Sequence, residues 1–128
     1  MSIRLLLSGV LVAHGIAHLV GFVSSWRLMT LAELPYRTTI LAGRVDLGDA
    51  GIRVVGMLWL VAGVAFVAGA WAVLADSTWW QTIVTFAFGA SLVLCLAGWP
   101  DARLGLLANA IVLGLALLAI RWGQLVRA

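Results

Sequence analysis

The sequence predicts an all-helical (all-α) membrane protein in which a single transmembrane domain, residues 1–128, forms a four-transmembrane-helix antiparallel bundle. The first observation is composition: 64% of the residues are hydrophobic and only 10% are charged, which is too little polar surface to cover a soluble domain. The second is a set of four long runs without charged residues, each close to or above the roughly 17–25 residues that cross a bilayer as a helix. Because an unpaired backbone group in lipid costs several kcal/mol, these runs should be helices.

The first predicted helix covers residues 4–25 and carries both histidines of the chain. His14 and His18 lie one turn apart and therefore share a face. The same helix has a stripe of small residues at four-residue spacing, Gly9, Ala13, Ala17 and Gly21. Such a stripe lets a second backbone approach closely, so we expect it to serve packing within the bundle or formation of a homodimer.

A long first connection follows, residues 26–51, and seven charged residues fall between Arg27 and Arg53. Connections of this length are often functional, so we interpret it as a lid, a partner-binding surface or an element at the membrane interface. We expect a short amphipathic segment at residues 28–34 that ends before Pro35, then an irregular or hairpin-like stretch. Asp49 is expected to cap the next helix.

The remaining helices are predicted at residues 52–75, 78–99 and 102–122, joined by short links. Thr78 and Gln81 have the spacing of a capping box at the start of the third helix. Pro100 should stop the third helix, and Asp101 can cap the fourth. Links this short make the joined helices antiparallel neighbours.

An even number of spans places both termini on one side of the membrane, here called side 1, and the long connection on the opposite side, side 2. All eight basic residues are arginines, and five of them belong to side 2, which favours a cytoplasmic side 2. The arginines flank the apolar runs instead of clustering, so the expected partner is the lipid bilayer and not nucleic acid. The sequence therefore predicts an integral membrane protein.

Counting residues from the ends of each run places nearly all the polar groups of the interior in the half nearest side 2. We expect one cleft there, lined by His14, His18, Trp59, Cys95 and Asn109. Four further charged residues lie just above it, toward or within the long connection, namely Asp101, Arg103, Arg53 and Glu33. Ionisable groups inside a membrane are expensive and usually mark a functional site, so these residues form the predicted ligand-binding site.

Several roles for the histidine pair stay open at this point. Two imidazoles one turn apart can hold a metal ion if other residues supply further ligands. Either ring could be an axial haem ligand, or the pair could bind a quinone carbonyl or relay protons. The purely structural alternative is that both rings are neutral and hydrogen-bonded to Asn109, Ser91 or backbone carbonyls, tying the first helix to the bundle.

Four motifs also suggest a family. In this order and spacing, "AHGIAHLVGF", "LAELP", "GMLWLVAG" and "GWPDARLGLLANAIVL" resemble an uncharacterised family of small four-span bacterial integral membrane proteins. The overall plan is similar to that of DoxX-like proteins, some of which are linked to quinone-dependent oxidation. The resemblance implies a bacterial cytoplasmic membrane. It also implies that the motif positions are functional, namely His14, His18, Glu33, Trp99, Asp101, Arg103 and Asn109.

The leading functional hypothesis is therefore a membrane-embedded cleft that binds a small hydrophobic or redox-active ligand of the quinone, haem or metal type at His14 and His18. One alternative is a dimeric proton-coupled carrier of small molecules. Another is an accessory or assembly subunit of a membrane complex, whose long connection binds the partner and whose histidines are structural. The sequence offers no arrangement of nucleophile, base and acid that would indicate a particular reaction.

Overall fold

The computed structural model describes the backbone of residues 2–127 and the side chains of residues 2–123, and it confirms the all-helical fold. The helices are α1 (Ile3–Ala17), α2 (Leu19–Ser25), α3 (Gly48–Leu74), α4 (Trp80–Ala97) and α5 (Arg103–Arg127). Because α1 and α2 continue one another, the described residues contain four helical spans that are long and apolar enough to cross a membrane. The chain is thus an integral membrane protein.

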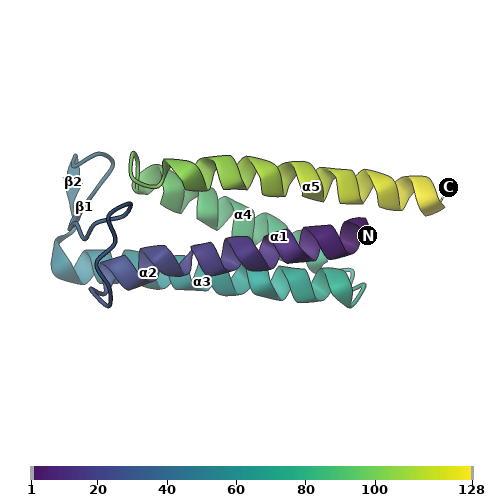
Figure 1. The fold of residues 1–128 in the computed structure, drawn as a ribbon, viewed down its shortest axis with the longest axis horizontal. Helices are drawn as coiled ribbons and strands as arrows, with labels where there is room; N and C mark the ends of the chain where they lie inside the picture. Colours follow the sequence, from purple (N-terminus) through teal and green to yellow (C-terminus); the bar gives the residue numbers. More distant parts are fainter. Residues whose placement is uncertain (1, 128) are drawn as a thin grey trace.

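The four spans lie side by side and run antiparallel to their sequence neighbours (Figure 1). The α1–α2 span packs against α3, α3 against α4, α4 against α5, and α5 returns to α1, which closes the bundle. Both termini lie at one end, as an even number of spans requires, and the long connection lies at the other. The end with the termini is side 1, and the end with the long connection is side 2.

Helices α1 and α3 approach each other closely where they cross. A Cβ atom on Gly15 would lie 2.7 Å from the carbonyl oxygen of Gly63, and a Cβ on Gly63 would lie 2.7 Å from that of Gly15. The predicted stripe of small residues does not pack against α3 as a whole. Gly21 is buried, whereas Gly9, Ala13 and Ala17 face outward. Packing of α1 within the bundle thus depends on Gly15 instead of these three residues, and their use in a homodimer stays a prediction.

The interior is divided into two apolar layers. The layer nearer side 1 contains Leu7, Leu11, Phe66 and Val112 among its buried residues. The layer nearer side 2 consists of Trp59, Ala62, Leu94, Cys95 and Ala102. His18 lies where these layers meet, since its ring centroid is 5.2 Å from those of both Trp59 and Phe66.

The caps predicted at the starts of α3 and α4 are wrong. α3 begins at Gly48, earlier than residue 52, and the Gly48 N–H donates to the carboxylate of Asp46 over 3.0 Å. This hydrogen bond is the main cause that lowers the pKa of Asp46. Asp49 lies in the first turn, where its carboxylate instead accepts hydrogen bonds from Arg27 and Tyr36.

At α4 the N-cap residue is Trp79, whose indole can only donate, so the Thr78–Gln81 capping box is not formed. The Ser77 hydroxyl accepts a hydrogen bond from the Trp79 N–H over 3.3 Å in its place. Both corrections have one cause: a polar residue nearer the turn reaches the first free N–H groups before the predicted cap does.

The long connection, residues 26–47, contains the expected hairpin but not the expected amphipathic segment. Strands β1 (Thr39–Ile40) and β2 (Val45–Asp46) pair antiparallel, whereas residues 28–34 form no helix. Arg27 has a φ of 54°, which turns the chain out of the helical path directly after α2.

The hairpin turn is attached to the end of α4. The N–H of Leu41 donates to the carbonyl of Ala97 over 2.7 Å, and that of Ala42 donates to the carbonyl of Trp99 over 3.0 Å. The last carbonyls of a helix have no partner within it, so the turn supplies the missing donors. The connection is therefore an ordered cover over the side 2 end.

Replacing Gly15 by Ala is expected to destabilise the protein by about 1–3 kcal/mol, because the new methyl group overlaps the Gly63 carbonyl and forces α1 and α3 apart. Gly9→Ala on the same helix is the matched control. A Cβ there would meet no other described atom within 4 Å, so this change should be neutral or stabilise by up to about 1 kcal/mol. Thermal unfolding in detergent measures both variants, and equal stability of the two would contradict the proposed contact.

Candidate functional site

A hydrogen bond between the His18 ring and the His14 carbonyl interrupts the first span. Nδ1 of His18 lies 2.8 Å from the carbonyl oxygen of His14, which also accepts from the His18 backbone N–H over 3.2 Å. One carbonyl thus serves two donors, and the next turn tightens, with the Gly21 N–H bonded to the carbonyl of His18. A side chain that competes for a helix carbonyl is a known cause of local breaks, and here it separates α1 from α2.

This contact also assigns the protons on His18. A carbonyl oxygen only accepts, so Nδ1 must carry the hydrogen, and in a neutral ring Nε2 is then an acceptor. Nε2 lies 2.8 Å from the hydroxyl oxygen of Ser91, which can donate to it. His18 therefore connects its own helix to α4 through one donor and one acceptor.

His14 makes the corresponding connection to α5. Its Nε2 lies 3.1 Å from the side-chain oxygen of Asn109, so it donates to that oxygen. The amide nitrogen of Asn109 in turn faces the sulfur of Cys95 on α4, at 3.8 Å. The five side chains of this buried network come from three spans: His14, His18, Ser91, Cys95 and Asn109.

Aromatic rings from α3 surround the two imidazoles. The ring centroids of His14 and His18 are 4.7 Å apart, and Phe66 lies 4.6 Å from His14 on an edge-to-face geometry. Trp59 lies 5.2 Å from His18. The network is thus enclosed by apolar rings, with His14 and His18 only 6% and 2% exposed.

The described residues around the histidines do not form a metal site with three or more protein ligands. Within residues 2–127 no three His, Cys, Asp or Glu side chains are close enough to hold a metal ion. Three of the four ring nitrogens already make hydrogen bonds inside the protein. Coordination through any of these three nitrogens would require breaking a buried hydrogen bond that has no water to replace it.

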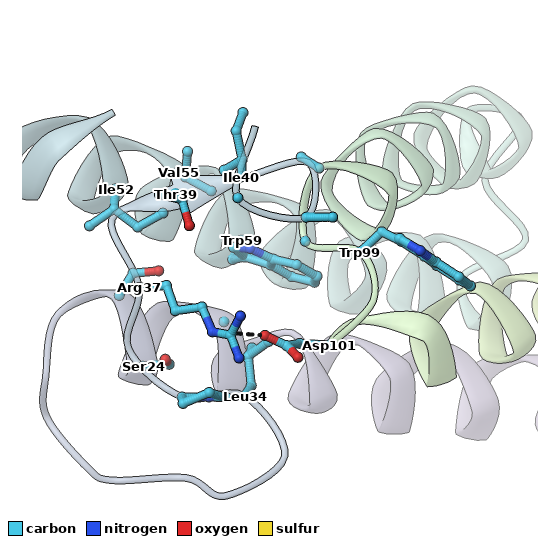
Figure 2. Close-up of a pocket in the computed structure, with 17 residues that line it drawn as sticks. Ser24, Leu34, Arg37, Thr39, Ile40, Ile52, Val55, Trp59, Trp99 and Asp101 are labelled. Carbon is cyan, nitrogen blue, oxygen red and sulfur yellow. Dashed lines mark ion pairs between the residues drawn. The ribbon is translucent and has the colours of Figure 1, made fainter. Parts of the chain in front are cut away.

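A cavity of about 60 Å³ lies above the network, between the helix ends and the long connection (Figure 2). Its polar groups are Ser24, Ser25, Arg37, Thr39 and Asp101, and its aromatic walls are Trp59 and Trp99. Nε of Arg37 forms an ion pair with Asp101 over 3.4 Å. Figure 2 shows these two side chains meeting beside the Trp59 indole.

Trp59 forms the boundary between the cavity and the histidines. It lines the cavity, and it also packs on His18 from the other side. Its indole lies flat against α2 because residue 21 is glycine: a Cβ there would be 2.4 Å from the ring. The cleft expected from the sequence therefore consists of two separate parts, a cavity above Trp59 and a packed network below it.

Of the predicted site residues, Trp59 and Asp101 line the cavity, while His14, His18, Cys95 and Asn109 form the network. The other three, Glu33, Arg53 and Arg103, are exposed and do not line the cavity. Arg53 instead lies 5.6 Å from the Trp26 ring, and its carbonyl accepts from the Trp26 indole N–H.

Sequence reasoning did not single out Arg37 or Thr39. Both belong to the long connection, whose path over the helix ends follows from the turn contacts with Ala97 and Trp99. The only available signal was a charged residue directly after "LPY" in a connection interpreted as a lid.

Comparison with known proteins adds no relative. No family model matches the chain, and neither a curated protein nor a solved structure is similar to it. The resemblance described under the sequence analysis stays a prediction.

The hydrogen bonds predict different tautomers for the two histidines. His18 should be neutral with its proton on Nδ1, and His14 should be neutral with its proton on Nε2. Solid-state NMR of the ring nitrogens in protein labelled with ¹⁵N-histidine distinguishes these forms. The same tautomer at both positions, or a charged ring at neutral pH, would contradict the network.

Replacing Ser91 by Ala removes the donor to Nε2 of His18 and leaves a buried acceptor unpaired. We expect a loss of about 1 kcal/mol, within the range measured for hydrogen bonds between helices in membranes. Thr85→Ala on the outward face of the same helix is the control and should have little effect. Equal melting temperatures for both variants would show that the Ser91 contact contributes nothing.

Proposed function

We propose that this integral membrane protein binds a small molecule in the side 2 cavity, with an aromatic or apolar body against Trp59 and a carboxylate or carbonyl oxygen at Arg37. The observation that carries the proposal is the position of Arg37, whose side chain comes from the covering connection and lines the same cavity as the Trp59 indole. A guanidinium has five N–H donors, and the one on Nε lies on the atom that forms the ion pair with Asp101 over 3.4 Å. The others are donors of the kind that an oxygen-bearing ligand requires.

The size and shape of the cavity support a small ligand. A volume of about 60 Å³ corresponds to several water molecules, since one water needs roughly 10–15 Å³ by the same measure. The hairpin turn and the Arg37–Asp101 pair hold the cover in place from two directions. A preformed site of this kind loses little entropy on binding.

The histidine network has a supporting role in this proposal. Its rings pack beneath Trp59 and fix the floor of the cavity, so the histidines orient the site without contacting the ligand. This role replaces direct coordination or hydrogen bonding of a quinone, haem or metal by His14 and His18. It also favours binding over passage across the membrane, because an apolar layer with Leu11, Phe66 and Val112 lies below the network.

The proposed setting is the bilayer of a bacterial cytoplasmic membrane with side 2 toward the cytoplasm. The larger number of arginines on side 2 supports this orientation, and the sequence motifs support the bacterial origin. The outward stripe of Gly9, Ala13 and Ala17 is compatible with a homodimer.

Benzoate and acetophenone, an aromatic carboxylate and an aromatic carbonyl compound, are suitable probes for the site. We expect both to give ligand-observed NMR signals of binding to the purified protein. Arg37→Gln should weaken benzoate binding about ten- to a hundredfold, because a charge-assisted hydrogen bond contributes about 1.5–3 kcal/mol.

Arg44→Gln is the matched control, since Arg44 lies in the hairpin turn, is exposed and does not line the cavity. This variant removes the same charge from the same connection and should bind benzoate as the wild type does. Binding that is unchanged in Arg37→Gln, or equally weakened in both variants, would overturn the proposed site.

A further inference from the structure

We infer that the side 1 end of the bundle holds one zwitterionic phospholipid of the phosphatidylethanolamine type. A second cavity of about 1270 Å³ lies there, surrounded by the start of α1, the end of α3, the α3–α4 link, the start of α4 and the end of α5. Pockets for drug-sized ligands are about 300–1,000 Å³, so this cavity has room for acyl chains. It is separate from the side 2 cavity, and the inference does not depend on the function proposed above.

The cavity is apolar in its depth and polar at its rim. Leu7 and Val73 line it and also belong to the buried layer nearer side 1, so they form its floor. Arg4, Asp76, Ser77 and Gln81 line it near the helix ends. This distribution matches a molecule with a hydrocarbon tail and a polar head.

The rim of this cavity lies at the level of the lipid headgroups, so we expect the bound molecule to come from the bilayer. Trp71, Trp79 and Trp122 are 73%, 68% and 62% exposed around this end, as expected for a belt of tryptophans at headgroup level. Trp122 also lines the cavity. A molecule that enters here comes from the headgroup region of the surrounding leaflet.

The charges at the rim select the headgroup. Arg4 from α1 forms an ion pair with Asp76 of the α3–α4 link, and both side chains are about half exposed, at 47% and 59%. The guanidinium has further donors for a phosphate, and the carboxylate has further lone pairs for an ammonium group. Phosphatidylethanolamine carries both groups, whereas phosphatidylglycerol lacks the ammonium and diacylglycerol lacks both.

Native mass spectrometry of the delipidated full-length protein tests this assignment. With an equimolar mixture of phosphatidylethanolamine and phosphatidylglycerol, we expect one bound lipid and a preference of about two- to fivefold for phosphatidylethanolamine, the range of one exposed charge pair. Diacylglycerol should bind more weakly than either phospholipid. No retained lipid, equal binding of diacylglycerol, or no preference between the phospholipids would overturn the inference.

Two variants locate the lipid. Asp76→Asn should abolish or reverse the preference for phosphatidylethanolamine, and the residue has a φ of 54°, which asparagine also tolerates. Ala119→Phe fills the cavity from α5 and should prevent binding, whereas Ala110→Phe on the outward face of α5 should not. An unchanged lipid ratio in Asp76→Asn would refute the site, and this ratio decides the question if Ala119→Phe does not fold.

Discussion

The hydrogen bond from Nδ1 of His18 to the carbonyl of His14 determines the organisation of the centre of the molecule. It gives the His14 carbonyl a second donor beside the His18 backbone N–H, and it fixes the plane of the His18 ring, so that Nε2 points at Ser91. The same ring position sets the packing of Trp59 and Phe66 on α3. Because the surrounding hydrocarbon offers no water, each of these polar atoms must have its partner inside the protein.

The two ends of the bundle are closed in different ways. At side 2 the connection is attached by backbone hydrogen bonds at Leu41 and Ala42 and by the ion pair of Arg37 with Asp101. At side 1 the exposed ion pair of Arg4 with Asp76 joins the start of α1 to the α3–α4 link. The cavity at side 2 is small, at about 60 Å³, and the cavity at side 1 is large, at about 1270 Å³.

The spans and the membership of the polar network were predictable because both follow from one-dimensional rules. Hydrophobic length gives the helices, and residue depth along each helix brings His14, Asn109 and Cys95 to one level. Rotation about the helix axis and the path of the connection are three-dimensional. For this reason the sequence did not reveal that Trp59 separates the histidines from the cavity, or that Arg37, and not Glu33 or Arg103, lines the cavity beside Asp101. The cap predicted at the start of α3 was wrong for a local reason. The direction of the chain at Gly48 lets the carboxylate of Asp46, and not that of Asp49, reach the Gly48 N–H.

The attachment of the hairpin turn to α4 uses only main-chain atoms, with Leu41 and Ala42 as donors and Ala97 and Trp99 as acceptors. Residue type at the turn is restricted through the backbone instead, because Leu41, Ala42 and Gly43 have positive φ values of 52°, 57° and 82°, which β-branched residues and proline do not adopt readily. Chain length is restricted too, because inserting or deleting a single residue between the strands would move both donors out of register with the helix end. This segment can therefore vary only with a fixed number of residues and with residue types that tolerate a positive φ and keep their N–H groups.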